Sequence, residues 1–515
     1  MLNKNTLLDA IIAYNNLDTK QINQLFNPLE FKISNHSLFI EAERIILNAI
    51  RLNQKIIICG DYDADGICST TILYRTLKKM KANVGYYIPN RFKEGYGLND
   101  NTVDLALDKG YELFILVDNG VSAESSLRKI HDAHKTCLIL DHHSYEGDVL
   151  CDCLVHPSLL DEDYHDMCGS GLAYNLSERL IGYDPFNASL AGIATIADLM
   201  PLWGFNRSLV IQSLKEINNH QAQVFMNLLN GNKAINETDL AFQLVPKLNA
   251  IGRLADIIDV NQVVKYLCLD NPSSIDAFSK EIIKINDLRK EINQKMYVKA
   301  LEMIDDKNVI VIYDEDFHEG IVGITAGRLS SELKKPVFVL NREGNRLKGS
   351  ARSYGSIDLR ELVSPAMGLL NRFGGHSQAA GLEIDVSNVE EFIRIINDNT
   401  DALIQKSEES HFLMMKEEWL NIDTFEEISQ YGPFGQGIKI PSFKFNDFTI
   451  KSSRIIRGGI SFDLIMNNIV YSAVYFQSVL DERLIQSDFT SFIGRVTLDE
   501  FRGHRKLKIM IESFE

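Results

Sequence analysis

Short apolar segments that each lead into an acidic loop are the feature that most constrains the fold of this 515-residue chain. Residues 55–59, 111–117 and 135–140 have the composition of buried parallel strands. In open α/β sheets, ligands bind beside the carboxyl ends of the strands, so the loops that follow are expected to meet at one site. These loops, with a later acid, are Asp61-Tyr62-Asp63-Ala64-Asp65-Gly66, Val117-Asp118-Asn119-Gly120, Asp141-His142-His143 and Ala197-Asp198.

The spacing of apolar residues predicts an α/β fold. Helices are predicted between the strands, over residues 67–80, 101–109 and 123–134, and one long amphipathic helix over residues 275–304. A second α/β unit is predicted from strands over 309–313 and 337–340 around a helix over 322–333. From about Phe412, short alternating segments predict an antiparallel β domain, a small barrel.

A chain of this length is too long for one core, and four parts are predicted. Residues 1–272 form a parallel-sheet domain with an N-terminal extension, and residues 273–305 form a connector helix. Residues 306–405 form a smaller α/β domain, and residues 410–515 form the β-barrel.

The predicted metal site takes its ligands from four separate loops: Asp63, Asp65, Asp118, His142 and Asp198. Carboxylates gathered so closely repel one another unless cations neutralise them, and this donor set suits Mg²⁺ or Mn²⁺ better than zinc. Two metals about 3.5–4 Å apart need a shared ligand, which predicts Asp118 as the bridge. Asp63 would then serve one metal, and the other three ligands the second.

The predicted chemistry is metal-assisted hydrolysis of a phosphoester by an activated water. His143 is left to bind a phosphate oxygen or to assist the leaving group, and Asp118 and Asp61 complete the predicted catalytic residues. Singly, the first acidic loop would also fit a turn with a helix cap, and Asp198 a chance acid at a helix end. The recurrence of such loops after successive strands favours the metal site.

A second group of residues combines basic side chains with special loops: Arg91, Arg253, Ser350, Arg352 and His376. An arginine with a hydroxyl can clamp a phosphate, and together these residues predict a groove for a phosphodiester chain, although each alone fits a surface charge. The tail interleaves basic and aromatic residues as single-strand platforms do, but a barrel core would explain most of the aromatics equally well. These residues are Arg454, Arg457, Arg495, Arg502, Arg505, Lys506 and Lys508, with Phe462, Tyr471, Tyr475, Phe476 and Phe501.

Composition and charge indicate where in the cell the protein is expected and which kinds of partner it could bind. The net charge of −17 argues against a general nucleic-acid coat protein but not against a nuclease, because phosphate binding depends on local charge. The sequence has no apolar run long enough for a membrane span, and its first residues lack a signal-peptide pattern. With seven cysteines and no disulfide framework, a reducing cytoplasm is expected.

These motifs resemble those of the DHH phosphoesterase superfamily, named for the triplet Asp141-His142-His143, and within it the bacterial RecJ single-strand-specific exonucleases. The resemblance covers nearly the whole chain. Besides the acidic loops, it includes residues 91–97, 197–202, 249–254, 318–323, 349–353 and 373–376.

The resemblance implies an exonuclease with two Mn²⁺ or Mg²⁺ ions that degrades single-stranded DNA from its 5′ end to mononucleotides in DNA repair and recombination. It assigns the second α/β domain as a DHH-associated domain that contributes His376, and the barrel as an oligonucleotide-binding (OB) fold. It implies a 5′-phosphate pocket of Arg91, Ser350 and Arg352, with Tyr96 against a base. Cys59 stands where many relatives carry a histidine able to ligate the first metal, which implies fewer ligands there.

The resemblance also implies partners, which are single-stranded DNA, single-strand-binding protein and a repair helicase. A monomer is also expected, and because the chain is shorter than many RecJ proteins, no further C-terminal partner domain is expected. Two alternatives remain. A DHH-type phosphodiesterase for short oligonucleotides or cyclic dinucleotides would not need the basic tail, and a non-catalytic binding protein would have lost metal ligands.

Overall fold

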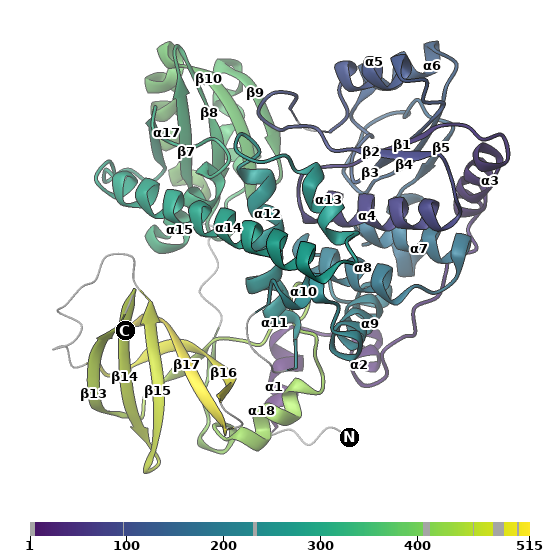
Figure 1. The fold of residues 1–515 in the computed structure, drawn as a ribbon. Helices are drawn as coiled ribbons and strands as arrows, with labels where there is room; N and C mark the ends of the chain where they lie inside the picture. The colour runs from purple at the N-terminus through teal and green to yellow at the C-terminus, as the bar shows by residue number, and fades with distance from the viewer. Residues whose placement is uncertain are drawn as a thin grey trace.

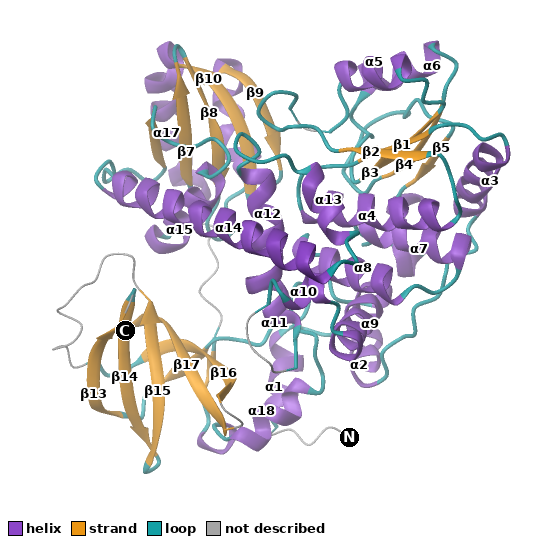
Figure 2. Ribbon diagram, viewed as in Figure 1, coloured by secondary structure: helices purple, strands orange, loops and turns teal. Residues whose placement is uncertain are grey.

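The computed structural model describes residues 6–95, 97–229, 234–404, 412–456, 458–476, 489–501 and 504–514. The chain folds into two α/β domains and a C-terminal β domain, with a long helix between the two α/β domains (Figures 1 and 2), as predicted. Every helix in the described ranges is too short or too polar to cross a membrane.

The first domain is built on a five-stranded parallel sheet with the order β2-β1-β3-β4-β5. The strands are β1 (Ile56–Cys59), β2 (Val84–Tyr87), β3 (Leu113–Val117), β4 (Thr136–Leu140) and β5 (Cys153–Val155). Within β1, Ile56 and Ile58 enter one hydrophobic core, whereas Ile57 and Cys59 enter the core on the other face. Burial of both faces explains why these strands are continuously apolar.

Helices α4 (Ala64–Lys79), α5 (Asp100–Asp108) and α6 (Glu124–Asp132) connect the strands, close to their predicted positions. The domain continues as a set of helices, and one of them, η3, is a π-helix. The other helices of the domain are α1 (Leu7–Tyr14), α2 (Thr19–Phe26), α3 (Ser37–Arg51), α7 (Gly169–Ile181), α8 (Pro185–Ala197), α9 (Gly204–His220), α10 (Gln223–Met226), α11 (Glu237–Asp239), η3 (Leu240–Leu244), α12 (Val245–Arg253) and α13 (Asn261–Leu267).

The connector is α14 (Pro272–Leu301), which begins and ends three residues before the predicted helix. Asn271 caps its N-terminus by accepting a hydrogen bond from Ser274 N at 3.0 Å, and Pro272 occupies the first turn, where a missing N–H costs nothing. Figure 1 shows α14 running between the two α/β domains.

The second α/β domain has a mixed sheet with the order β6-β7-β8-β10-β9, in which only β6 and β7 pair in parallel within the described strands. Helix α15 has its predicted bounds. The elements are β6 (Ile310–Asp314), α15 (Val322–Leu333), β7 (Val337–Glu343), β8 (Arg346–Arg352), α16 (Leu359–Val363), β9 (Leu370–Gly375), β10 (Ala379–Asp385) and α17 (Val389–Ile404).

The C-terminal domain is a seven-stranded sheet with the order β11-β12-β16-β17-β15-β14-β13. Most neighbours pair antiparallel, but β15 with β17 and β11 with β12 pair in parallel. The elements are β11 (Leu413–Met414), α18 (Ile422–Ser429), β12 (Phe443–Phe445), β13 (Thr449–Ile456), β14 (Gly459–Met466), β15 (Ile469–Phe476), β16 (Phe492–Phe501) and β17 (His504–Phe514).

The aromatic residues of this domain mainly form its core. Phe462 is fully buried, and Tyr471 is buried with its hydroxyl donating to Leu420 O at 2.8 Å. Phe476, by contrast, is 54% exposed. Arg457 and Arg502 lie outside the described residues. The core interpretation therefore accounts for the buried rings, and a single-strand platform would have to use others.

The N-terminal extension packs against the C-terminal domain as well as the first. Leu8 and Ile11 of α1 share a hydrophobic core with Trp419 and strand residues of the β domain. The side chain of Asn15 donates to Lys439 O and accepts from Lys439 N, both at 2.9 Å. The two ends of the described chain are therefore held together by one core.

Candidate active site

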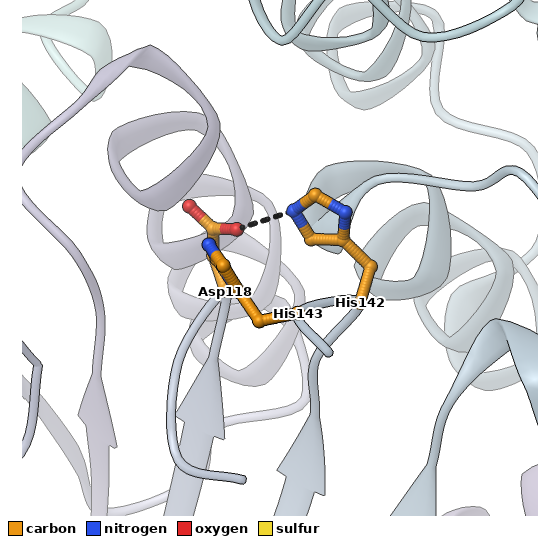
Figure 3. A group of neighbouring side chains, drawn as sticks. All are labelled: Asp118, His142 and His143. Carbon is orange, nitrogen blue, oxygen red and sulfur yellow. Dashed lines mark ion pairs between the residues drawn. The ribbon is translucent and has the colours of Figure 1, made fainter. Parts of the chain in front are cut away.

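The predicted acidic and histidine residues meet at the carboxyl ends of β1, β3 and β4. His142 is the central group: its Nε2 lies 3.2 Å from Asp118 Oδ1, 3.3 Å from Asp198 Oδ2 and 3.8 Å from Asp65 Oδ2. Figure 3 shows the His142 ring turned toward the Asp118 carboxylate from the neighbouring loop. Residues 77 positions apart along the chain, such as Asp65 and His142, are thus brought into one group.

Local backbone geometry sets the position of Asp118. It has a φ of 59°, a left-handed conformation that aspartate tolerates better than most residues. Gly169 allows the start of α7 to approach, because a Cβ there would lie 2.8 Å from Asp118 Cβ. Asn119 completes the turn: its side chain donates to Cys59 O at 3.1 Å and to Val117 O at 2.8 Å.

Helix N-termini hold the carboxylates of Asp63 and Asp65. Asp63 caps α4 by accepting from Asp65 N at 3.0 Å and Gly66 N at 3.1 Å. Asp65 accepts 2.7 Å hydrogen bonds from Gly169 N and Ser170 N, at the start of α7. The glycine-rich segment at 169–171 therefore orients an acidic side chain. The N-termini stabilise negative charge without neutralising it.

The carboxylate of Asp141 contacts the imidazole ring of His143. It is fully buried and accepts hydrogen bonds from Val121 N at 3.1 Å and His142 N at 2.8 Å, and its Oδ1 lies 2.7 Å from His143 Nδ1. Burial lowers the pKa of His143, but the hydrogen bond and charge of Asp141 outweigh it and raise this pKa to about 9. His143 can therefore carry positive charge near neutral pH.

Asp61 belongs to the carboxylate group, whereas Cys59 does not. Ligand atoms of Asp61, Asp63 and Asp118 lie within 4.8 Å of one another. Cys59 is buried in the apolar core between the sheet and helices α5 and α6. Burial raises the pKa of its thiol to about 12. Strand alternation turns the Cys59 side chain toward this core, so it adds no ligand atom to the carboxylate group. Asp61, two residues later, supplies the additional carboxylate.

The site is largely buried and strongly acidic. Burial and the neighbouring carboxylates raise the pKa of Asp118 and of Asp61 well above the ordinary value, and burial also raises the pKa of Asp63. The pKa of Asp198 is raised to about 8, by burial and then by the charge of Asp65. Without a cation, these raised pKa values favour the protonated carboxyl groups, and bound divalent cations would reverse this.

Two buried polar atoms in this site have no hydrogen-bond partner among the described residues, as is expected of atoms that ligate a metal ion. Asp61 Oδ1 and His142 Nε2 are buried and make no hydrogen bond to any described group. His142 Nε2 is within 3.3 Å of two carboxylate oxygens, so its contacts are close but not aligned as hydrogen bonds. One imidazole nitrogen and two carboxylate oxygens that lie this close together could bind the same cation. Ligand atoms form two further compact groups: Asp65, His142 and Asp198, and Asp118, His142 and His143.

Helix α12 contacts the first acidic loop through a hydrogen bond and a close backbone approach. Asn249 accepts a hydrogen bond from Ala64 N at 2.8 Å through its Oδ1. One turn later, a Cβ at Gly252 would lie 2.1 Å from Tyr62 O, so only glycine allows this approach. Arg253 follows directly and therefore lies beside the acidic loop.

Arg253 is also the centre of an arginine group built from both α/β domains. Burial lowers its pKa to about 10, and the positive charges of Arg91, Arg289 and Arg352 contribute to this lowering. Arg91 lies over the Tyr62 ring, with its Cζ 4.7 Å from the ring centroid. The arginine group, defined as these four residues, joins the loop after β2, helices α12 and α14, and strand β8.

Close backbone contacts bring the second domain against this group. A Cβ at Gly320 would lie 1.9 Å from Arg253 O, and one at Gly323 would lie 3.1 Å from Arg352 Nη2 and 3.2 Å from Ser350 Oγ. The start of α15 thus lies between α12 and β8. The structure brings together the predicted residues Arg91, Arg253, Ser350 and Arg352.

Two predicted substrate residues are not placed in the arginine group. His376 lies exposed in the turn between β9 and β10, and its side chain makes no hydrogen bond or ion pair with the described residues. Tyr96 lies outside the described residues.

Arg289 is the residue that sequence reasoning missed. Its Nη2 donates to Asn286 Oδ1 at 2.7 Å, and its Nε is buried without a hydrogen-bond partner among the described residues. Arg289 does not disturb the amphipathic spacing of apolar residues on α14, and charged residues are common on such a helix. Its only sequence signal is a place on the partly apolar side of α14, beside Ile285 and Leu288.

Comparisons with known proteins agree with this architecture. The model of the DHH family, N-terminal domain, matches residues 55–200, the DHHA1 domain model matches 306–401, and the RecJ OB domain model matches 413–513. The single-stranded-DNA-specific exonuclease RecJ of Bacillus subtilis is 29% identical over 541 residues, which cover 98% of this chain and 67% of the relative.

Two solved structures are also similar. RecJ in complex with Mn²⁺ from Thermus thermophilus aligns with a TM-score of 0.81 and 24% identity over 99% of this chain and 76% of that one, a likeness of fold. An exonuclease RecJ bound to manganese aligns with a TM-score of 0.63 and 29% identity over 72% of this chain and 96% of that one. The chain belongs to the DHH phosphoesterase superfamily and, within it, to the RecJ family.

Proposed function

We propose that this protein is a two-metal exonuclease that degrades single-stranded DNA from its 5′ end to mononucleotides. The observation that carries this proposal is the adjacency of the acidic site and the arginine group through α12, which contacts both. An acidic metal site suits the scissile phosphate, and a cationic pocket beside it suits a terminal phosphate. The relatives named as single-stranded-DNA-specific exonucleases support the substrate.

The donor set suits two divalent cations, Mn²⁺ or Mg²⁺. Asp61, Asp63 and Asp118 would hold one, and Asp65, His142 and Asp198 with Asp118 would hold the other. When bound, the cations would neutralise the phosphate and lower the pKa of an attacking water. His143, held by Asp141, would donate a hydrogen bond to a phosphate oxygen or a proton to the leaving oxygen.

The arginine group would act as the 5′-phosphate pocket. Its guanidinium groups repel one another, and a phosphate dianion between them would remove that repulsion and form charge-assisted hydrogen bonds. Ser350, beside Arg352 on β8, adds a hydroxyl donor. A 5′-phosphorylated end would then set which phosphodiester reaches the metals.

Small-substrate hydrolysis is the alternative. The acidic site fits cyclic dinucleotides or short oligonucleotides equally well, but the match of residues 413–513 to a RecJ OB domain favours a longer strand. A non-catalytic role is not supported, since the predicted metal-ligand residues are all acidic or histidine and lie together.

The deciding experiment is digestion of a long single-stranded DNA labelled at either end, with Mn²⁺ and with chelator. Mononucleotides released from the 5′ end, only with metal and not from duplex, are the expected result. Asp118→Ala is the catalytic control and should abolish release, because it removes a ligand from both cations. Cleavage confined to dinucleotides or a few linked residues would move the protein to the small-substrate class.

Binding of metal can be measured without activity. Mn²⁺ should raise the midpoint of thermal unfolding of the unmodified protein, since a ligand of the folded state stabilises it, and should do so less in Asp118→Ala. The cytoplasmic location, the monomeric state and partners such as single-strand-binding protein and a repair helicase belong to the same proposal.

A further inference from the structure

Leu199 is an exposed leucine in a strained conformation directly beside the acidic site. It follows Asp198, whose Oδ2 lies 3.3 Å from His142 Nε2. Its φ is 53°, and the residue is 72% exposed. Of the large exposed apolar residues in the described chain, only Phe242, at 74%, is more exposed. A leucine there gains nothing from burial within this chain.

The end of helix α8 explains the left-handed backbone of Leu199, but it does not explain why the side chain is apolar. Met200 N donates to Thr195 O at 3.1 Å and Leu199 N donates to Ile196 O at 3.2 Å, the two hydrogen bonds of a Schellman C-cap at the end of α8. The residue at the left-handed position of this motif is usually glycine, because a Cβ is disfavoured there. Leucine therefore makes the local fold less stable than glycine would.

We propose that Leu199 packs against the base of the nucleotide at the scissile phosphate. This rests on the proposed function. Neighbouring Cα atoms are about 3.8 Å apart, so a phosphate held by the Asp198 group has its own nucleoside within reach of the next side chain. An exposed apolar side chain at that place offers an unpaired base a surface that excludes water. It would favour unpaired over paired DNA, since a paired base has its faces covered by stacking.

The test compares Leu199→Gly and Leu199→Asn with the unmodified protein, because both residues accept a left-handed backbone. Neither change should lower the midpoint of thermal unfolding, and both variants should keep their Mn²⁺ dependence. On single-stranded DNA, kcat/KM should fall about tenfold, the loss expected for one leucine contact. On DNA whose two 5′-terminal nucleotides are abasic, the variants and the unmodified protein should differ less than about twofold, because the contact that the variants lack is then missing from every reaction.

Lys334→Gly is the matched control. Lys334 is exposed and ends α15 with a φ of 54°, so the change relieves the same backbone strain away from the acidic site and should leave kcat/KM unchanged. An unchanged kcat/KM in Leu199→Gly, or an equal loss on abasic DNA, would overturn the base contact. A shifted Mn²⁺ dependence would instead show a role in holding Asp198. The proposed function itself fails only if the unmodified protein releases no nucleotides.

Discussion

Four guanidinium groups drawn from distant parts of the chain make up the arginine group centred on Arg253, and their mutual repulsion has to be compensated. Burial makes this repulsion stronger, because water no longer screens the charges. In the proposed pocket, a phosphate dianion would provide that compensation with bidentate geometry. At the scale of single residues, the charges of the arginine group therefore complement those of the acidic site.

Arg289→Gln tests whether the connector helix contributes to phosphate recognition. Loss of one charge-assisted contact should lower the preference for 5′-phosphorylated over 5′-hydroxyl single strands about tenfold. The ratio of kcat/KM on the two substrates measures this preference. Arg128→Gln, at an exposed residue paired with Glu124 on α6, is the control and should keep the preference. An unaltered ratio in Arg289→Gln would remove Arg289 from the pocket.

Three helix ends define the acidic site at the scale of elements. The N-terminus of α4 binds Asp63, that of α7 binds Asp65, and α12 closes on the loop that carries both. Helices are rigid over several turns, so carboxylates fixed by their ends keep the same separation in every molecule. The approach of α12 depends on Gly252.

Gly252→Ala should therefore disturb the metal site without touching a ligand. Its new Cβ would lie 2.1 Å from Tyr62 O, and a backbone atom cannot move aside without shifting the loop. We expect a loss of about 1–3 kcal/mol in the free energy of unfolding, as for other overpacked sites. The stabilisation by Mn²⁺ should also become smaller. Thermal unfolding with and without Mn²⁺ measures both effects.

Gly368→Ala is the control, because a Cβ there would meet nothing within 4 Å. It should retain the stability and the Mn²⁺ response of the unmodified protein. A Gly252→Ala protein that also retained them would show that α12 does not position the acidic loop.

At the scale of the whole molecule, Arg207 connects the first domain to the C-terminal domain. It is buried on α9, and its guanidinium donates to the carbonyl oxygens of Tyr431, Gly432 and Pro433, the last two at 2.9 Å. Burial lowers its pKa to about 10, which still leaves it charged at neutral pH. The core that α1 shares with the β domain lies in the same region.

Arg207→Met keeps the apolar stem and removes all of these hydrogen bonds. Three carbonyl oxygens would lose their donor, at roughly 1–3 kcal/mol for each one left buried and unpaired, so the midpoint of thermal unfolding should fall clearly. Digestion of long single strands should fall more than cleavage of short oligonucleotides, because the acidic site is left intact. Arg44→Met, at an exposed residue paired with Glu41 on its own helix, should change neither. Equal losses on long and short substrates would contradict a role of the C-terminal domain in holding the strand.

The α/β class, the strands and connecting helices, and the acidic residues that meet could all be predicted from the sequence. These follow from local patterns: buried strands are continuously apolar, and parallel strands end at one edge of the sheet. Asp63, Asp65, Asp118, His142 and Asp198 were recognisable because each follows or ends such an element. The resemblance to a family added the prediction of a 5′-phosphate pocket.

Which distant elements meet became known from the three-dimensional fold. It brought Arg289 to Arg253, turned the Cys59 side chain into the core beside α5 and α6, and packed α1 into the C-terminal core. No local pattern records these contacts, since a surface arginine and a pocket arginine have the same neighbours in sequence. The difference lies in long-range packing, which sets whether a side chain faces water, a core or another charge.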